Sequence, residues 1–394
     1  MRSDVRALAF AWLLLLHLYY GRHSSLLKTS IIYIVCHSFS SYKHKLDLPF
    51  FNGGIYSQRF AGGRSGGAPG PESNDAANTA RCEIGLFVSP GSAPMQRELY
   101  LASSPAAGAV QVHEHKRFLT VLPDDDSLAI ANNSGNNIQI ISANGALRRN
   151  LGSRGDAPGQ FLGPAGLACD GLAIYVTDWC HRVQKLKLDG TSVATACEYG
   201  SGEGQLCFPT GAALAGGILF VADTLNNRVV RFDAESLKWL STFGGEGRAE
   251  GQFLGPCGLA STEDEVFVVD GHGQRIQVFN LQGGFVRTFG SWGTEPGQFD
   301  GPRGIAVANG HLYVAELGTA LGGGGRVQEL SLDGRPLQVL ESPAGSPLYG
   351  VCVVSRQDCT PNNSSALYVT GADDSKLHVF IAANGGAHQP QPQR

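Results

Sequence analysis

From residue 159 onward the chain repeats one pattern of three markers. The triplet Gly-Gln-(Phe/Leu) recurs with a period of 45–47 residues, a proline follows each of its glycines by five positions, and an acidic residue follows each proline by fourteen. The glycines are Gly159, Gly204, Gly251 and Gly297, the prolines are Pro164, Pro209, Pro256 and Pro302, and the acids are Asp178, Asp223, Asp270 and Glu316. Because three markers move together through four copies, the fold must be built from one repeated structural unit.

Each copy holds four short β-rich runs and no helical stretch. A small apolar run follows the proline, as in Gly304–Val307, and three further runs come after it, as in Val266–Asp270, Arg275–Phe279 and Phe285–Phe289. The 53 glycines of the chain suit the many tight turns that such short strands need. Four strands in about 45 residues is the size of one blade of a β-propeller.

Weaker copies lie on both sides of the four clear ones. Ile130–Asn132 with Asn137–Ile140 gives a copy before them, and Leu367–Gly371 with Lys376–Phe380 gives a copy after them. An insertion, roughly Arg356–Ser365, lengthens the last copy. The sequence therefore predicts an all-β fold, a propeller of four-stranded blades, with six blades over about 118–385.

Two more β-rich runs, Glu98–Ala102 and Ala109–Val112, precede the first weak copy. Only 29 residues separate Ser103 from Asn132, too few for a complete blade. These runs form either a partial, eroded seventh blade or strands that close the ring with the last blade. We favour six blades.

The motifs Pro-x-Gly-(Ile/Leu)-Ala, (Tyr/Phe)-Val-x-Asp, Asn-Asn-Arg-(Ile/Val)-x-x-Phe and Gly-x-x-Gly-x-x-x-Gly-Gln-Phe together resemble the NHL repeat. The resemblance covers roughly 115–380 and is most specific over 159–316. It implies a β-propeller, usually of six blades. It leaves the activity open, because one fold carries many functions.

The N-terminal part differs from the propeller region in composition. We expect residues 1–60 to be a hydrophobic leader, either a signal peptide or membrane anchor or an unstructured segment with no targeting role. Arg2 and Arg6 precede the apolar run Ala7–Tyr20, as in a signal or anchor, but no small-x-small cleavage site follows. The expected location is secreted or membrane-anchored if this run is a signal or anchor, and cytoplasmic otherwise. The remaining divisions are a Gly/Pro/Ser-rich linker at 61–81, the propeller at 82–385 with clear repeats at about 118–380, and a disordered tail at 386–394.

Charge and cysteine content narrow the function classes. Residues 1–80 carry eight Lys/Arg and four Asp/Glu, so the rest of the chain has a net charge of −8. A net acidic propeller argues against nucleic acid as the partner, although a local basic patch leaves RNA open. The nine cysteines include no C-x-x-C pair, which argues against a zinc ribbon or a thioredoxin-like site. We expect scattered thiols, with one or two disulfides as the alternative.

An arginine follows each acid of the repeat at the start of the next β-rich run. In the first weak copy both positions change together, to Asn132 and Asn137, which indicates that the two side chains pair across the hairpin. Such a partly buried pair is structural, and removing one partner should cost more than removing both. The predicted pairs are Asp178 with Arg182, Asp223 with Arg228, Asp270 with Arg275, and Glu316 with Arg326.

The loop between acid and arginine varies freely from copy to copy, and equivalent loops of a propeller lie on one face. Variable loops on a fixed scaffold are how a binding face is built, so we expect a partner there. The residue after each proline should approach the same face near the axis. The candidate partner-binding residues are Trp179, His181, Thr224, Asn226, His272 and Arg303.

The favoured function is a non-enzymatic scaffold that binds a protein or peptide through these loops, with no cofactor and no metal. One alternative is a propeller enzyme, a metal-dependent lyase or hydrolase. In the peptide-amidating lyases, which resemble NHL proteins, histidine follows the repeat proline; here Ala165, Thr210, Cys257 and Arg303 stand there. The other alternative is an RNA-binding or ubiquitin-ligase-associated recognition propeller, but the chain has no RING spacing of its own.

Overall fold

The computed structural model describes residues 85–86, 95–100, 116–123, 127–143, 145–342, 345–355, 365–372 and 376–381. The predicted leader, linker and tail, the run Ala109–Val112 and insertion residues 356–364 lie outside this set. In the described ranges, no helix has the length and hydropathy needed to cross a membrane. They include a short 3-10 turn, η1 (Thr224–Asn226).

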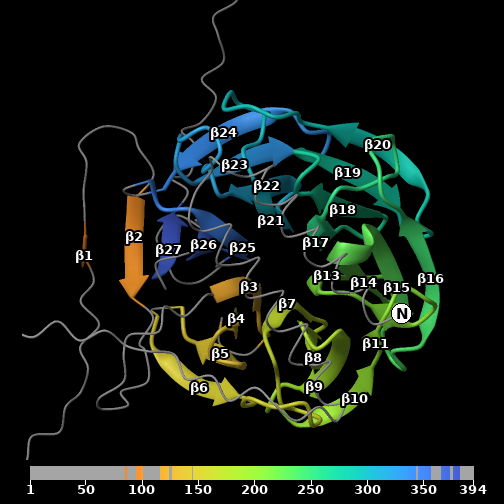
Figure 1. The fold of residues 1–394 in the computed structure, drawn as a ribbon. Coiled ribbons are helices and arrows are strands. Elements are labelled where there is room, and N and C mark those ends of the chain that lie inside the picture. Colours follow the sequence, from red (N-terminus) through yellow and green to blue (C-terminus); the bar gives the residue numbers. More distant parts are fainter. Residues whose placement is uncertain are drawn as a thin grey trace, which may run out of the picture. The chain divides into compact units, whose positions relative to one another are not determined.

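Five four-stranded sheets and one five-stranded sheet, all antiparallel, form a closed ring of six blades, and this confirms the six-bladed β-propeller (Figure 1). We number the blades 1 to 6 along the chain. Blade 1 has β3 (Lys116–Val121), β4 (Leu128–Asn132), β5 (Asn137–Ile141) and β6 (Leu147–Leu151), and blade 2 has β7 (Pro164–Cys169), β8 (Ala173–Asp178), β9 (Arg182–Lys187) and β10 (Ser192–Ala196). Blade 3 has β13 (Pro209–Ala215), β14 (Ile218–Asp223), β15 (Arg228–Asp233) and β16 (Trp239–Gly244), and blade 4 has β17 (Pro256–Ser261), β18 (Glu265–Asp270), β19 (Arg275–Asn280) and β20 (Phe285–Phe289).

Blade 5 has β21 (Pro302–Ala308), β22 (His311–Glu316), β23 (Arg326–Ser331) and β24 (Pro336–Glu341), and blade 6 has β25 (Leu348–Ser355), β26 (Ser365–Gly371) and β27 (Lys376–Ile381). The short strands β11 (Glu198–Tyr199) and β12 (Gln205–Leu206) pair in the linker before blade 3. The first strand of each blade lies nearest the axis, so β3, β7, β13, β17, β21 and β25 surround the centre (Figure 1).

The ring is closed by a strand from the N-terminal side of the propeller. The outer strand of blade 6 is β2 (Met95–Tyr100), which pairs antiparallel with β27 over six residue pairs and is itself flanked by β1 (Gly85–Leu86). This settles the two alternatives for the upstream runs, because β2 completes the sixth blade and begins three residues earlier than predicted. Closure covers the edge that β27 would otherwise expose.

The apolar core lies between blades. Six clusters of buried side chains fill the six interfaces between neighbouring blades, including the one that joins blade 6 to blade 1. The aromatic residue of the Gly-Gln-Phe motif is fully buried in three of these copies, as Phe161, Phe253 and Phe299, and Leu206 takes its place in the fourth. The motif therefore recurs because each of these four interfaces takes one large apolar side chain from the linker.

The glycine of Pro-x-Gly lets the innermost strands approach one another. A Cβ at Gly166 would lie 2.0 Å from the carbonyl oxygen of Thr210, and a Cβ at Gly304 would lie 2.3 Å from that of Tyr349. Gly350 has the same relation to the carbonyl of Arg117 across the closing interface, at 2.5 Å. Only glycine fits where backbone approaches backbone so closely.

Candidate functional site

The four predicted acid–arginine pairs are formed, and each acid is fully buried. The closest nitrogen–oxygen distances are 3.1 Å for Asp178 with Arg182, 2.7 Å for Asp223 with Arg228, 2.8 Å for Asp270 with Arg275 and 3.0 Å for Glu316 with Arg326. In blade 1, Asn132 Nδ2 donates to Asn137 Oδ1 at 3.2 Å in place of the ion pair.

Each pair also fastens the linker that enters its blade. In blade 3 the Asp223 carboxylate accepts the backbone N–H of Cys207 at 2.6 Å, and Arg228 donates to the carbonyls of Ser201 and Gln205. Burial raises the pKa of the Asp178, Asp223 and Glu316 carboxyls, against the lowering effect of their arginines and hydrogen bonds. The pairs are thus structural clamps between a hairpin and a linker.

The loops between second and third strands lie on the same face as the linkers between blades, because the first and third strands of a blade both begin there. We call this the loop face. It carries all six candidate partner-binding residues and all four clamps. The turns between first and second strands lie on the opposite face.

Three of the candidate residues make hydrogen bonds within the ring. Thr224 donates its hydroxyl to the carbonyl of Pro256 at 2.9 Å, and Asn226 donates to the carbonyl of Gly200 at 2.8 Å and to Asp223 Oδ2. His181 Nδ1 accepts the backbone N–H of Phe208 at 3.2 Å.

The ring of His181 packs against two aromatic side chains. Its centroid lies 4.9 Å from that of Phe208 and 4.8 Å from that of Tyr199. Burial lowers the pKa of His181, in keeping with a neutral ring that accepts a hydrogen bond. Its contacts connect the loop of blade 2 to the linker before blade 3.

The other three candidates, Trp179, His272 and Arg303, lie around the mouth of the axis. Arg303 extends over Gly271, where an added Cβ would lie 2.6 Å from Arg303 Nη1. Desolvation, together with the charge of Arg303, lowers the pKa of His272. Trp179 begins the corresponding loop of blade 2, and its backbone N–H donates to the carbonyl of Gly163.

Two residues at the mouth were not among the sequence candidates. Arg117 and Tyr349 occupy, in blades 1 and 6, the position that follows the repeat proline. In both blades the proline is replaced, by Lys116 in blade 1 and by Leu348 in blade 6. The Pro-x-Gly motif therefore does not identify Arg117 and Tyr349. Blade 6 keeps the glycine of the Pro-x-Gly motif, Gly350, and this glycine could have located Tyr349. Blade 1 has Phe118 at the glycine position, so no part of the motif indicates Arg117.

Arg117 lies between two aromatic rings. Its guanidinium carbon is 4.6 Å from the ring centroid of Tyr349 and 5.2 Å from that of Trp179. Tyr349 in turn meets Phe118 edge to face, with centroids 5.3 Å apart. Among the side-chain atoms that the structure describes, Arg117 Nε and Trp179 Nε1 are buried and have no hydrogen-bond partner.

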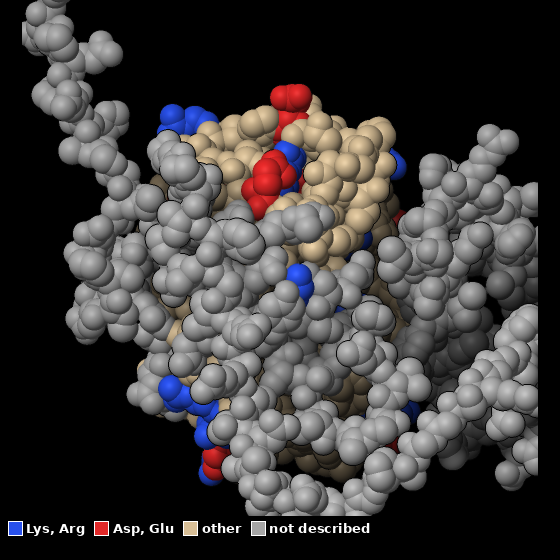
Figure 2. All heavy atoms as spheres, turned by 90° about the vertical axis from the view of Figure 1, so that its left-hand side faces the viewer, with Lys and Arg blue, Asp and Glu red and all other residues tan. Residues whose placement is uncertain are grey.

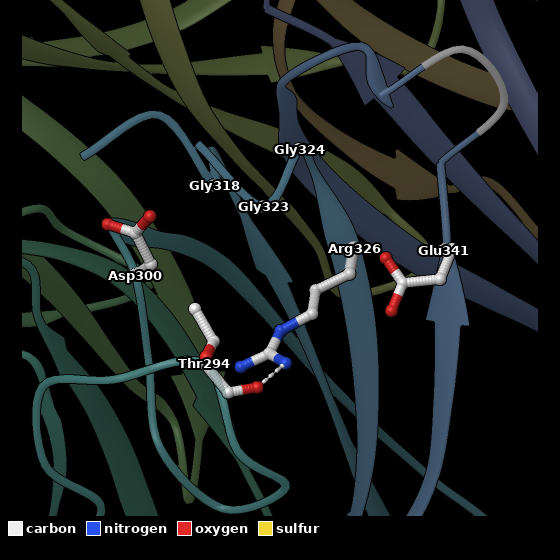
Figure 3. A pocket seen from close by; sticks show the side chains of 7 residues that line it. All are labelled: Thr294, Asp300, Gly318, Gly323, Gly324, Arg326 and Glu341. Carbon is white, nitrogen blue, oxygen red and sulfur yellow. Dashed lines mark hydrogen bonds between the residues drawn. The ribbon is translucent and has the colours of Figure 1, made fainter. Parts of the chain in front are cut away.

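A pocket of about 200 Å³ lies beside the Gly-rich loop of blade 5. In Figure 3 the Arg326 side chain lies between Asp300 and Glu341 and is hydrogen-bonded to Thr294. The Arg326 guanidinium is already bound to Glu316 and to backbone carbonyls.

Asp300 holds the Gly-rich loop in place. The side-chain Oδ2 of Asp300 accepts a hydrogen bond from the backbone N–H of Leu321 at 2.9 Å. The backbone carbonyl of Asp300 accepts one from the backbone N–H of Gly318. Leu162 and Leu254 stand at this position in two other copies, and only the copy with the inserted loop has an acid there. We interpret the pocket as the space beneath an anchored loop.

No reactive side-chain cluster emerges elsewhere in the described part of the chain. Within it, no group of three or more His, Cys, Asp and Glu side chains is placed to hold a metal ion, and six cysteines are free thiols. In the side view of Figure 2, the visible charged side chains of the described residues are few, and acidic ones adjoin basic ones.

Comparison with known proteins places the fold. No model of a known protein family matches the chain. A segment of 72 residues is 40% identical to the RING finger protein nhl-1 of Caenorhabditis elegans, covering 18% of this chain and only 7% of nhl-1. The structure is similar to XC5397 from Xanthomonas campestris, a gluconolactonase, with a TM-score of 0.50 and 16% identity over 73% of this chain and 89% of that one. It is also similar to virginiamycin B lyase from Staphylococcus aureus, with a TM-score of 0.49 and 17% identity over 78% of this chain and 97% of that one.

The gluconolactonase, at 16% identity, supports the propeller fold alone. The repeat, the six blades and the match to nhl-1 together define the class of protein. The chain is a six-bladed β-propeller, and its repeat resembles the NHL repeat.

Proposed function

We propose that this propeller binds a protein or peptide partner through its loop face. The observation that carries the proposal is the distribution of exposed apolar side chains on that face. Four large ones, from four different loops or linkers, are between 44% and 63% exposed. They are Tyr199, Leu225, Trp292 and Leu321.

The loops and linkers that carry these side chains are held by buried bonds. The clamps Asp223–Arg228 and Glu316–Arg326 bind the linkers before blades 3 and 5, and Asp300 anchors the loop that carries Leu321. A fixed frame reduces the entropy lost when a partner binds. Exposed apolar side chains on a fixed frame suit a protein surface better than a small polar substrate.

The test is capture from a native cell extract on the immobilised full chain, with and without RNase. The loop-face variant replaces Tyr199, Trp292 and Leu321 by serine. The matched control is Leu172→Ser, because Leu172 is 83% exposed in the turn between β7 and β8 on the opposite face.

We expect a defined set of proteins that survives RNase, is lost with the loop-face variant and is kept with Leu172→Ser. Capture that is unaffected by the loop-face variant, or lost equally with both, would overturn the proposal. Loss of every partner after RNase would assign the face to RNA instead.

A further inference from the structure

The half-buried and buried arginines of the ring fall into two groups. Five of them are paired with a carboxylate: Arg182, Arg228, Arg275 and Arg326 with the blade acids, and Arg287 with Glu265 at 2.5 Å. Arg117, Arg231 and Arg303 pair with no carboxylate among the described residues. Arg231 Nη1 donates to the Ser241 hydroxyl at 2.8 Å and to the carbonyl of Gln282, whereas Arg303 Nη1 donates to the carbonyl of Pro302 at 3.1 Å.

Two of these three arginines, Arg117 and Arg303, stand at the mouth of the axis. The inner strands follow one another around the ring in chain order, and β25 contacts β3, so blades 1 and 4 face each other across the axis (Figure 1). Arg117 belongs to blade 1. Arg303 belongs to blade 5 but leans onto Gly271 of blade 4. The two positive charges therefore flank the mouth from opposite sides.

Two aromatic rings hold the Arg117 guanidinium at the mouth. Tyr349 and Trp179 contact it at centroid distances of 4.6 and 5.2 Å. Cation–π contacts of this kind do not use the N–H donors of a guanidinium, which can still bind a planar acceptor. A carboxylate is such an acceptor, since its two oxygens match the spacing of two guanidinium N–H groups.

Space for Arg303 depends on one small residue. Gly271 follows the acid of blade 4, where the other clear copies have Trp179, Thr224 and Leu317. Gly271 has no positive φ, so the absence of a side chain, and not backbone freedom, distinguishes it. The glycine thus makes room for the guanidinium beside the mouth.

The loops around the mouth supply no negative charge in five of the six blades. Residues 133–136, 179–181, 224–227, 271–274 and 317–325 contain no Asp or Glu. The sixth loop contains Asp373 and Asp374, which lie outside the described residues. An anionic group that entered the mouth would therefore meet two arginines and no described acid of these loops.

We propose that Arg117 and Arg303 bind a carboxylate of the peptide partner at the mouth of the axis. The inference rests on the proposed function and names the chemistry of its central contact. The carboxylate comes either from an Asp or Glu side chain or from a peptide C-terminus, and the test separates the two.

The experiment measures binding of the full chain to fluorescein-labelled random peptide pools of Ala, Ser, Leu and Tyr by fluorescence polarisation. One pool carries a central Glu and a C-terminal amide, a second a central Gln and a free C-terminus, and a third a central Gln and an amide. We expect one of the carboxylate pools to bind about tenfold more tightly than the uncharged pool, as for a charge-assisted hydrogen-bonded pair. The tighter pool names the source of the carboxylate.

Arg117→Met and Arg303→Met are each expected to reduce this preference, and the double variant to reduce it to about one. Gly271→Ala keeps both charges but displaces Arg303, so it too should lower the preference. Arg335→Met is the matched control, because Arg335 is exposed in the turn between β23 and β24 on the opposite face. The thermal unfolding midpoint of each variant reports whether it has folded.

The failures are distinguishable. If no pool binds, the proposed function fails, and the inference with it. If pools bind with no preference for a carboxylate, or with one that both arginine variants keep, only the inference is overturned. A random RNA oligonucleotide that binds through both arginines, with no preference among the peptide pools, would also overturn it.

Asp373→Asn with Asp374→Asn removes the two acids of the sixth loop and should leave binding of the carboxylate pool as tight or tighter. Loss of binding in that variant would assign recognition to these acids and overturn the inference.

Discussion

Arg228 Nε lies 2.7 Å from Asp223 Oδ2, and both side chains also bind the backbone of the linker that enters their blade. The acid is fully buried and the arginine nearly so. Such a pair makes the two residues depend on each other, because either one alone leaves an uncompensated charge. Asn132 and Asn137 of blade 1 show that a neutral pair can hold the same hairpin.

Arg228→Met is therefore expected to lower the free energy of unfolding by about 3–5 kcal/mol. The double variant Asp223→Asn with Arg228→Met should cost less than Arg228→Met alone, because no charge remains buried. Urea unfolding of both single variants and the double variant gives the coupling energy. Strictly additive effects would contradict the account of a buried, coupled pair.

Gly211 tests the approach of one inner strand to the next. A Cβ there would lie 2.1 Å from the carbonyl oxygen of Cys257 and 2.9 Å from the N–H nitrogen of Leu259, and neither backbone atom can turn away. Gly211→Ala should lower the free energy of unfolding by about 3 kcal/mol or more. Gly323→Ala is the control, since its Cβ would meet nothing closer than 3.8 Å and should change stability by less than about 0.5 kcal/mol. Equal effects of the two substitutions would show that the strands have room to move apart.

The clear repeats were predictable because each marker has a local structural role. The sequence predicts a strand over Val266–Asp270, and β18 extends it by one residue, to Glu265. The proline, glycine and acid of each copy contact their own blade or the adjacent one, so the same pattern recurs in every clear copy. The repeat period then predicts a ring of blades.

Ring closure left no comparable signal. The strand β2 pairs with β27, nearly 280 residues away in the chain, and a pairing of that kind produces no local motif. The position of Arg117 was not predictable for a related reason, since blade 1 has Lys116 and Phe118 where other blades have proline and glycine. Residues that depart from a repeat are hard to align with it, yet here they form part of the candidate site.

His181 gives the loop face a dependence on pH. Its Nδ1 accepts the N–H of Phe208, so protonation of the ring breaks that hydrogen bond, and burial lowers the pKa of His181 below its ordinary value of 6.5. A lowered pKa in the folded state means that stability present above pH 6.5 is lost as the pH falls through the lowered pKa. The free energy of unfolding should therefore fall more steeply below pH 6.5 in the wild type than in His181→Asn.

Asparagine suits this comparison because His181 has a φ of +64°, a region that asparagine tolerates, and its side-chain oxygen can accept a hydrogen bond. The measurement is urea unfolding from pH 7.5 to 5. Parallel pH profiles for the two proteins would rule out His181 as the titrating group.

Asp300 tests whether the Gly-rich loop is anchored by a single carboxylate. Asp300→Leu restores the residue found at 162 and 254, removes the acceptor of the Leu321 N–H and also removes Asp300 Oδ1, which is buried without a partner. We expect hydrogen exchange at the Leu321 amide to quicken by about tenfold, since one hydrogen bond to a charged group is worth roughly 1.5 kcal/mol. Global stability should change little, because a leucine fits this position in two other blades.

The Leu225 amide is the internal control, because it bonds to the carbonyl of Cys207 in the corresponding loop of blade 3 and is untouched by the substitution. Unchanged exchange at Leu321 would mean that the backbone bond from Gly318 to the carbonyl of Asp300 holds the loop by itself. Faster exchange at both amides would mean that the substitution loosens the loop face as a whole. Faster exchange at Leu321 alone assigns the anchoring of this loop to the Asp300 side chain, which the copies with Leu162 and Leu254 lack.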